Sequence, residues 1–384
     1  MLRFFIVSAI CFFSLSAMAQ IIRTDGAVLH VSNSSTVLTS GGISIQNNGA
    51  IQNAGTIYLG GDWINNGLGL TGALTGNVDF NGNQLQFIGG SSTTTFSLLR
   101  ITNTSNVALS NNTNIGQTLV FNSGKINTGP YEVRMINPPA NPILGAGAGK
   151  YVNGNLRVAY ALGNPPSFKY EIGSNAYAPA IVSLSSVSNA GTMVASTTSG
   201  PSSLENFPTI GASGIDPSAR VDRHWSLSQS ALAYADYDVI FDYSNTPFTG
   251  SPSNYLIRRY RPQSGWQSEI TSNNGATASG VLNEGVFVIG ESSSTSINNL
   301  DSSPFRIHPN PANDRIFLNG LNSFGEKSSI TILDLSGRKV FGLETEKSNT
   351  AIIDLQPLLL TSGVYTVRIE GDVSSGVFKT IIHK

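Results

Sequence analysis

Charged residues are scarce in this chain of 384 residues, and the two signs nearly cancel. Lys and Arg number 22 against 23 Asp and Glu, so charged residues make up 12% of the chain and the formal net charge is −1. An average protein has about 25% charged residues. Nucleic acid and anionic membranes attract proteins through a surplus of basic charge, which is missing here. We therefore expect no nucleic-acid partner.

Cysteine is almost absent as well. The only cysteine is Cys11, which lies in an apolar stretch near the N-terminus. Disulfide bonds, thiol catalysis and thiolate metal sites all need cysteine in the mature chain. The sequence also has no Gly-x-Ser-x-Gly, His-Glu-x-x-His or phosphate-binding glycine loop. We therefore expect a protein that is not an enzyme, with no catalytic residue, no cofactor and no metal ligand.

The N-terminus has the three parts of a secretory signal peptide. Arg3 gives a positive start, and Phe4–Leu15 is apolar but too short to span a bilayer. Small residues precede the expected cleavage site between Ala19 and Gln20. We expect the Sec machinery to transport the chain and signal peptidase to remove residues 1–19. A buried N-terminal helix is the alternative.

A six-residue rhythm runs through the segment that follows the signal peptide. An apolar residue and a glycine each recur every six residues, with asparagines between them. Such a unit predicts a short strand followed by a corner, because glycine and asparagine readily adopt the left-handed conformation that turns need. The apolar residues are Ile45, Ile51, Ile57 and Trp63, and the glycines are Gly49, Gly55, Gly61 and Gly67.

Stacking of successive six-residue units predicts a β-solenoid in which the isoleucines lie over one another inside. Asn47, Asn53 and Asn65 would lie near the bends, where stacked amides can form ladders. A series of tight hairpins is the competing explanation. After Gly67 the pattern loosens, and it predicts coils of roughly 20 residues in a right-handed parallel β-helix. The stretch 76–129 resembles the repeat-rich regions of surface adhesins and autotransporter passengers.

The chain changes character after a stretch rich in Pro and Gly at 137–150. Longer runs with more aromatic residues follow, and their order and spacing predict an antiparallel β-sandwich over residues 151–291. The motifs "RHWSL", "YLIRRYR" followed by "GW", and "VFVIGE" resemble a module that often precedes the sorting domain in secreted Bacteroidetes proteins. That resemblance implies no catalytic signature.

Three carboxylates of this middle region invite a metal or catalytic interpretation. Asp236, Asp238 and Asp242 alternate with aromatic and apolar residues, so in a strand they would lie on the solvent face over an aromatic core. A Ca²⁺ site would need oxygens that converge from loops, so we expect a solvated face instead. Trp266 follows a glycine turn, and it is expected either in the core or as a platform on which a sugar ring stacks.

The C-terminal part carries the most specific signal. After a Ser-rich linker at 292–303, short alternating runs predict a β-sandwich of roughly seven strands over residues 304–384. Four landmarks occur in order: "HPNPAND" at 308–314, "LDLSGRKV" at 333–340, "SGVYTVRI" at 362–369 and "FKTIIHK" at 378–384. Together they closely resemble the type A C-terminal sorting domain of the type IX secretion system.

Physical roles can be assigned to the landmark residues. The prolines would fix the entry turn, a glycine would make a hairpin turn, and another would allow the bend before the last core strand. A lysine near the end would present positive charge. The residues that we assign to the sorting motif are Pro309, Asn310, Pro311, Asp334, Gly337, Gly363, Val364, Tyr365 and Lys379.

The resemblance implies an export route. The chain would reach the periplasm, the type IX translocon would carry it across the outer membrane, and a sortase-like protease would cut it in the linker. The cargo would then be released or attached to surface lipopolysaccharide, so the expected location is the outer-membrane surface or the medium. An immunoglobulin-like module without a sorting role is the alternative for residues 304–384.

The expected fold class is all-β, with an N-terminal β-solenoid at 20–150, a middle antiparallel β-sandwich and a small immunoglobulin-like β-sandwich at the C-terminus. We expect an exported cell-surface or extracellular protein with a structural or adhesive role, in which the solenoid forms a shaft. The alternative is a carbohydrate-binding or carbohydrate-active protein that works along the solenoid groove or near Trp266. Surface glycans are partners that either hypothesis allows.

Overall fold

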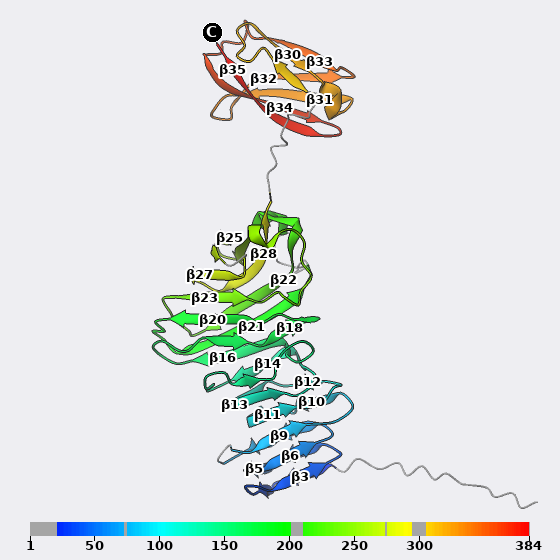
Figure 1. Cartoon of the computed structure of the whole chain (residues 1–384), viewed down its shortest axis with the longest axis vertical. Coiled ribbons are helices and arrows are strands. Elements are labelled where there is room, and N and C mark those ends of the chain that lie inside the picture. The colour runs from blue at the N-terminus through cyan, green and yellow to red at the C-terminus, as the bar shows by residue number, and fades with distance from the viewer. Residues whose placement is uncertain (1–20, 73–74, 201–209, 273–274, 294–304, 384) are drawn as a thin grey trace, which may run out of the picture. The chain divides into compact units, whose positions relative to one another are not determined.

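In the computed structural model the chain is an all-β protein of two compact units, divided between residues 293 and 294 (Figure 1). The expected cleavage site at Ala19 and Gln20, and residues 294–303 of the expected linker, lie outside the described residues. Among the described helices, none has the length and apolar character needed to cross a membrane. The described residues are 21–72, 75–200, 210–272, 275–293 and 305–383.

The first unit begins as a β-solenoid whose coils have three walls of parallel strands. The first wall stacks β1 (Ile22–Asp25), β4 (Ile43–Gln46), β7 (Trp63–Asn66), β10 (Gln86–Gly89), β12 (Val107–Leu109), the starts of β14 (Ile126–Met135) and β16 (Val152–Tyr160), and β18 (Ile172–Ser174). The third wall stacks β3 (Thr36–Thr39), β6 (Thr56–Leu59), β9 (Asn77–Phe80), the ends of β11 (Thr94–Ile101) and β13 (Thr113–Phe121), and β15 (Ile143–Leu144).

The second wall consists of two ladders. One stacks β2 (Val28–Val31), β5 (Ala50–Asn53) and β8 (Gly69–Leu70). The other stacks the starts of β11 and β13 and the ends of β14 and β16. The longer strands therefore bend round a corner and contribute to two walls each.

Each coil takes roughly 20 residues and contains three of the six-residue units, because the strand that begins at Ile43 pairs with the one that begins at Trp63. The solenoid prediction is confirmed, and the parallel pairing excludes a series of hairpins. The predicted stacking of consecutive isoleucines is wrong. Ile45, Ile51 and Ile57 lie on β4, β5 and β6, which are three different walls of one coil. The six-residue rhythm therefore marks successive walls, and the residue stacked over Ile45 is Asn65, 20 residues further along.

The side chains of the three walls meet in a common interior. Ile45, Ile51, Ile57 and Trp63 all have an exposed fraction of 0%. Burial of side chains of this size stabilises a fold by about 1.5–3 kcal/mol each. The indole Nε1 of Trp63 donates a hydrogen bond to Thr94 at 2.9 Å, so this large ring is buried without an unsatisfied polar group.

Buried asparagines hold the corners of the coils. The Oδ1 atom of Asn65 accepts a hydrogen bond from the backbone N–H of Gly67 at 3.1 Å, and its Nδ2 donates to the carbonyl of Thr93 at 3.4 Å. Asn53 makes the corresponding two bonds at another corner. The predicted ladder of stacked amides is not formed here, because Asn65 lies over Ile45. These amides instead tie each turn to the backbone of the next coil.

Asn65→Ala is expected to destabilise the first unit by about 1–3 kcal/mol, because it removes a buried amide together with both of its hydrogen bonds to the backbone. Urea unfolding of the purified protein measures this change. The control is Asn122→Ala, since Asn122 is exposed and bonds only the hydroxyl of Thr102 among the contacts described. Equal losses in the two variants would contradict the role given to the buried amide.

The pairing direction changes at β16, which belongs to both parts of the first unit. Its parallel neighbours are β14 and β18, and its antiparallel neighbour is β21 (Gly191–Ser199). The expected boundary at residue 150 therefore falls inside one compact unit. The antiparallel sheet continues through β22 (Ile215–Ser230), β28 (Gly285–Ser292), β24 (Tyr255–Arg261) and β25 (Gly265–Ser268).

A second sheet packs against this one and completes the predicted β-sandwich. Phe241 of the second sheet contacts Trp225 on β22 at 4.9 Å and Phe287 on β28 at 5.2 Å between ring centroids. The strands of the second sheet are β17 (Phe168–Tyr170), β20 (Ala180–Ser185), β23 (Asp236–Phe241), β27 (Thr277–Val281) and β26 (Ile270–Ser272). The remaining short elements of the unit are β19 (Ala176–Tyr177), η1 (Ile210–Ser213) and η2 (Pro252–Asn254).

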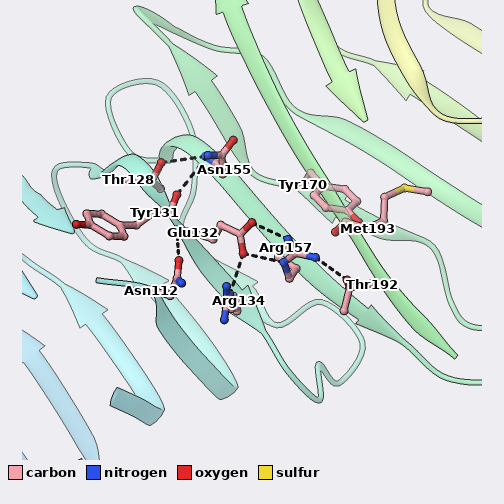
Figure 2. A network of polar contacts seen from close by, with 10 residues as sticks. All are labelled: Asn112, Thr128, Tyr131, Glu132, Arg134, Asn155, Arg157, Tyr170, Thr192 and Met193. Atoms are coloured by element: carbon pink, nitrogen blue, oxygen red, sulfur yellow. Dashed lines mark hydrogen bonds and ion pairs between the residues drawn. The ribbon is translucent and has the colours of Figure 1, made fainter. Parts of the chain in front are cut away.

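A mostly buried carboxylate connects the solenoid to the antiparallel sheet (Figure 2). Arg157 on β16 donates two hydrogen bonds to Glu132 on β14, both at 2.7 Å, and Arg134 donates a third to the same carboxylate at 2.8 Å. The third nitrogen of Arg157 donates to Thr192 on β21 at 2.7 Å. The hydrogen bonds from Arg157 hold the pKa of Glu132 below its ordinary value of 4.5.

Glu132→Gln is expected to destabilise the first unit by about 1–3 kcal/mol at neutral pH, because the two arginines lose their counter-charge. A lowered pKa in the folded state means that the carboxylate stabilises the fold above the ordinary value of 4.5. That contribution is lost as the pH falls through the lowered value, so the gap between wild type and variant should close in acid. Denaturant unfolding over a pH series measures the gap.

The control for this experiment is Asp222→Asn. Asp222 forms a longer ion pair with Arg220, at 3.7 Å, and its side chain is 47% exposed. The Arg220 side chain is only 12% exposed, but the pair is long and its carboxylate is solvated, so this variant should lose less stability than Glu132→Gln. A gap for Glu132→Gln that stays constant down to strong acid would contradict the linkage.

The second unit is a β-sandwich with a hydrophobic core of its own. That core includes Ile316, Ile330 and Val367, each with an exposed fraction of 0%. Seven strands lie in residues 305–383, as the sequence predicts. One sheet contains β29 (Arg306–His308), β30 (Arg315–Asn319) and β33 (Thr350–Asp354), and the other contains β32 (Lys339–Glu346), β31 (Lys327–Leu333), β34 (Gly363–Gly371) and β35 (Ser375–Ile382), with η4 (Leu321–Phe324) between β30 and β31.

Candidate functional site

The four landmarks of the second unit meet at one end of its four-stranded sheet. β34 pairs antiparallel with β31 and with β35, so that Thr366 lies opposite Leu333 on one side and Lys379 on the other. The turn after β31, the start of β34 and the end of β35 therefore share one end. Ala312 of the first landmark forms a bridge to Ile382 at the same end. We call this region the landmark end.

Asn310 joins the first landmark to the last strand. Its Oδ1 accepts a hydrogen bond from the N–H of Ile381 at 2.8 Å, and its Nδ2 donates to the carbonyl of Lys379 at 3.4 Å. The N–H of Ala312 donates to the carbonyl of Ile381 at 2.8 Å. The first landmark thus adds a short parallel segment beside β35, and the charged side chain of Lys379 stays exposed, as predicted.

Pro309 and Pro311 line a shallow hollow of about 550 Å³ beside this joint. Both prolines are exposed, and both follow a cis peptide bond. Asp314 ties the hollow to the segment after β33, because its carbonyl accepts the N–H of Leu355 at 2.7 Å. The other residues that line the hollow are Asn313, Arg315, Phe317 and Gln356. The landmark prolines therefore shape an open polar surface.

Asp334 organises the hairpin turn between β31 and β32. One carboxylate oxygen accepts the Ser336 hydroxyl at 2.6 Å and two backbone N–H groups, and the other accepts Nε of Arg338 at 3.0 Å. These hydrogen bonds lower the pKa of Asp334 to about 2, and the bond from the Ser336 hydroxyl has the largest effect. Gly337 has a φ of 80°, which favours glycine, so its predicted place in the turn fits.

Tyr365 is a buried residue of the third landmark, as are Val367 and Ile369. Its exposed fraction is 6%, and its hydroxyl donates to the carbonyl of Thr361 at 2.9 Å. Val364 next to it lies opposite Ile381 of the last strand. We predicted that position 363 requires glycine, but the structure shows no such requirement. The backbone of Gly363 is not left-handed, and an added Cβ would come no nearer than 3.9 Å to another atom.

The three aspartates and Trp266 of the first unit do not form one site. Asp236, Asp238 and Asp242 lie on or just after β23, with Tyr237, Val239 and Phe241 buried between them, so the predicted alternation is confirmed. Trp266 lies on β25 in the other sheet, and it packs against Tyr260 at 5.3 Å between ring centroids. The part of the chain that the structure describes holds no group of three or more His, Cys, Asp or Glu residues suited to a metal ion.

A cavity of about 590 Å³ lies in the first unit, where the solenoid meets the sandwich. Its rim contains segments 137–142 and 164–167, and each of these includes an Asn-Pro-Pro run that the sequence analysis did not connect with the other. Inside, Nζ of Lys169 lies 3.3 Å from the carboxylate of Glu171, and both side chains bond the hydroxyl of Tyr177. The charged groups of this cavity therefore satisfy one another.

Residues 306–383 match the family model of the secretion system C-terminal sorting domain. Neither the curated proteins nor the solved structures contain a match to this chain. The predicted type IX sorting domain is confirmed by the family match, which covers the second unit and includes all the residues assigned to the sorting motif. A domain of this family supports export through the type IX secretion system, to the medium or to the cell surface.

Asn310→Ala is expected to loosen the end of β35, because the N–H of Ile381 loses its partner. The amides of residues 379–383 should exchange with solvent faster, by about tenfold for a loss of about 1.4 kcal/mol. Hydrogen exchange of the full chain, read by mass spectrometry, measures this. Asn313→Ala is the control, since Asn313 lines the adjacent hollow, and unchanged exchange in Asn310→Ala would contradict the role of the joint.

Proposed function

We propose that this protein is an exported structural or adhesion protein, and that its solenoid and sandwich act together as one stiff body outside the cell. The sorting domain at 306–383 supports the export step. The observation that carries the rest of the proposal is the unbroken parallel ladder of the first wall, from β1 to β18.

Stiffness follows from this ladder and from the core behind it. Neighbouring strands lie about 4.8 Å apart, so the first wall extends over roughly 35 Å. A single hydrophobic cluster runs from Val31 in the first coil to Ile289 in the sandwich. A bend at any level would expose part of this cluster and break several backbone hydrogen bonds, so the unit resists deformation.

Uncharged polar side chains form part of the outer surface of the solenoid. Side chains on neighbouring coils form hydrogen bonds with each other along the same wall. Asn114 donates to Thr95 at 3.2 Å, and Asn153 donates to Asn127 at 2.9 Å. Amide and hydroxyl groups can both donate and accept hydrogen bonds. Such a surface suits neutral polar partners such as surface glycans, and this supports an adhesive role without catalysis.

Deletion of residues 306–383 is expected to keep the protein in the periplasm, because the truncated chain lacks the sorting domain that directs it across the outer membrane. Mass spectrometry of the periplasm, the cell surface and the medium of producing cells locates both forms. Cells that lack the whole protein should then adhere less and form less biofilm, and cells with the truncated form should share this defect.

Three outcomes separate the parts of this proposal. Export of the truncated form would contradict the role of the sorting domain. Normal adhesion by cells that lack the protein would contradict the adhesive role while leaving export intact. Release of sugar from a polysaccharide panel by the purified protein would favour the carbohydrate-active alternative over a protein without catalysis.

A further inference from the structure

Each strand of the first coil is paired with a described strand on one edge only. β1, β2 and β3 pair with β4, β5 and β6 respectively, and with no other strand of the described residues. Each therefore presents a row of unpaired backbone N–H and C=O groups at one edge. Rows of this kind are templates for pairing with another chain.

The interior of the solenoid is open at the same end. Ile22, Leu29 and Val37 face inward but are only partly buried. The residues stacked on them in the next coil, Ile43, Ile51 and Ile57, have exposed fractions of 1%, 0% and 0%. The first coil is therefore less covered than the second at these three positions, while its other inward residues, Thr24, Val31 and Thr39, are buried.

Apolar side chains outside the core add to this exposed end. Ile21, Val28 and Leu38 have exposed fractions of 65%, 47% and 75%. Val28 corresponds in register to Ala50 of the next coil, which is only 2% exposed. An apolar surface beside unpaired strand edges favours a partner that supplies both strands and apolar side chains.

The charged residues of β1 are arranged so that two copies of this strand would match each other. Arg23 and Asp25 flank Thr24 on β1 and form an ion pair at 2.7 Å, with side chains 62% and 43% exposed. If β1 paired antiparallel with β1 of a second copy, centred on Thr24, each Arg23 would lie opposite Asp25 of the other copy. Directly opposite side chains of an antiparallel pair share a face, so both ion pairs could form.

We propose that the first coil is an interface at which two copies of this chain join end to end. A two-fold axis that lies midway between the two β1 strands, perpendicular to these strands and to the solenoid axis, pairs β1 with β1 and each β2 with the β3 of the other copy. All of these pairs are antiparallel, because the axis reverses the direction in which the second coil runs. The join covers the open interior and continues the hydrogen-bonded walls from one copy into the other.

The interface is one coil wide, so it lies at the small end of the range for protein interfaces. We therefore expect a dimer that forms and dissociates with protein concentration. Light scattering coupled to size-exclusion chromatography, on residues 20–384 over a series of concentrations, measures it. This chain is the form that the predicted signal cleavage leaves.

Charge reversal tests the register of the pair. R23D would place a second carboxylate opposite Asp25 of the other copy at two symmetric positions, and D25R would place a second guanidinium opposite Arg23 in the same way. Each single variant is expected to raise the dissociation constant at least about tenfold, because like charges directly opposite repel. The double variant R23D/D25R restores opposite charges at both positions and is expected to dimerise like the wild type.

R368D is the matched control. Arg368 and Glu370 form the same kind of exposed ion pair two residues apart, but on β34, which is paired on both sides. Circular dichroism confirms that each variant is folded, since all the changed side chains are exposed. A wild type that stays monomeric at every concentration overturns the proposal. So does a dimer that the single variants leave intact, or one that the double variant fails to restore.

Discussion

The structure of the first unit depends on one constraint, which is that a single coil cannot bury its own apolar side chains. Ile45, Ile51 and Ile57 point inward from three walls of one coil, and their upper and lower surfaces are covered only by the coils on either side. Parallel stacking supplies that cover and also pairs the backbone of every wall. The corner asparagines follow from the same constraint, because a tight turn next to a stacked coil leaves backbone groups that only a short polar side chain can reach.

The two ends of the solenoid meet this constraint in different ways. At β16 the walls pass into antiparallel pairing with β21, and the sandwich covers the last coil without a break in the core. Glu132 lies at this transition, and its hydrogen bonds with Arg157 fix the strand on which both pairings depend (Figure 2). At the other end the first coil has no such cover among the described residues. The same physical requirement that explains the sandwich therefore also explains why a second copy would be stabilised on β1, β2 and β3.

The sequence predicts those features that depend on local pattern. The period of two places Tyr237 in the core, the order of the landmarks identifies the sorting domain, and the glycine and asparagine rhythm identifies short strands with corners. The sequence does not reveal which units stack, because a six-residue rhythm is compatible with any number of walls. The number of walls depends on how many strands close one coil. Contacts between distant segments are hidden for the same reason. The bond from Asn65 to Thr93 and the meeting of Asn310 with Ile381 depend on pairings that no short stretch of sequence encodes.

The two units have separate hydrophobic cores. The core around Ile316 and Val367 shares no residue with the cluster that runs from Val31 to Ile289. Each unit therefore buries its own apolar surface, and the described strands pair only within their own unit. Cleavage of the chain between the two units would leave each of these two clusters with all of its own residues. A protein organised in this way can lose its sorting domain after export and keep the stiffness on which a structural or adhesive role would depend.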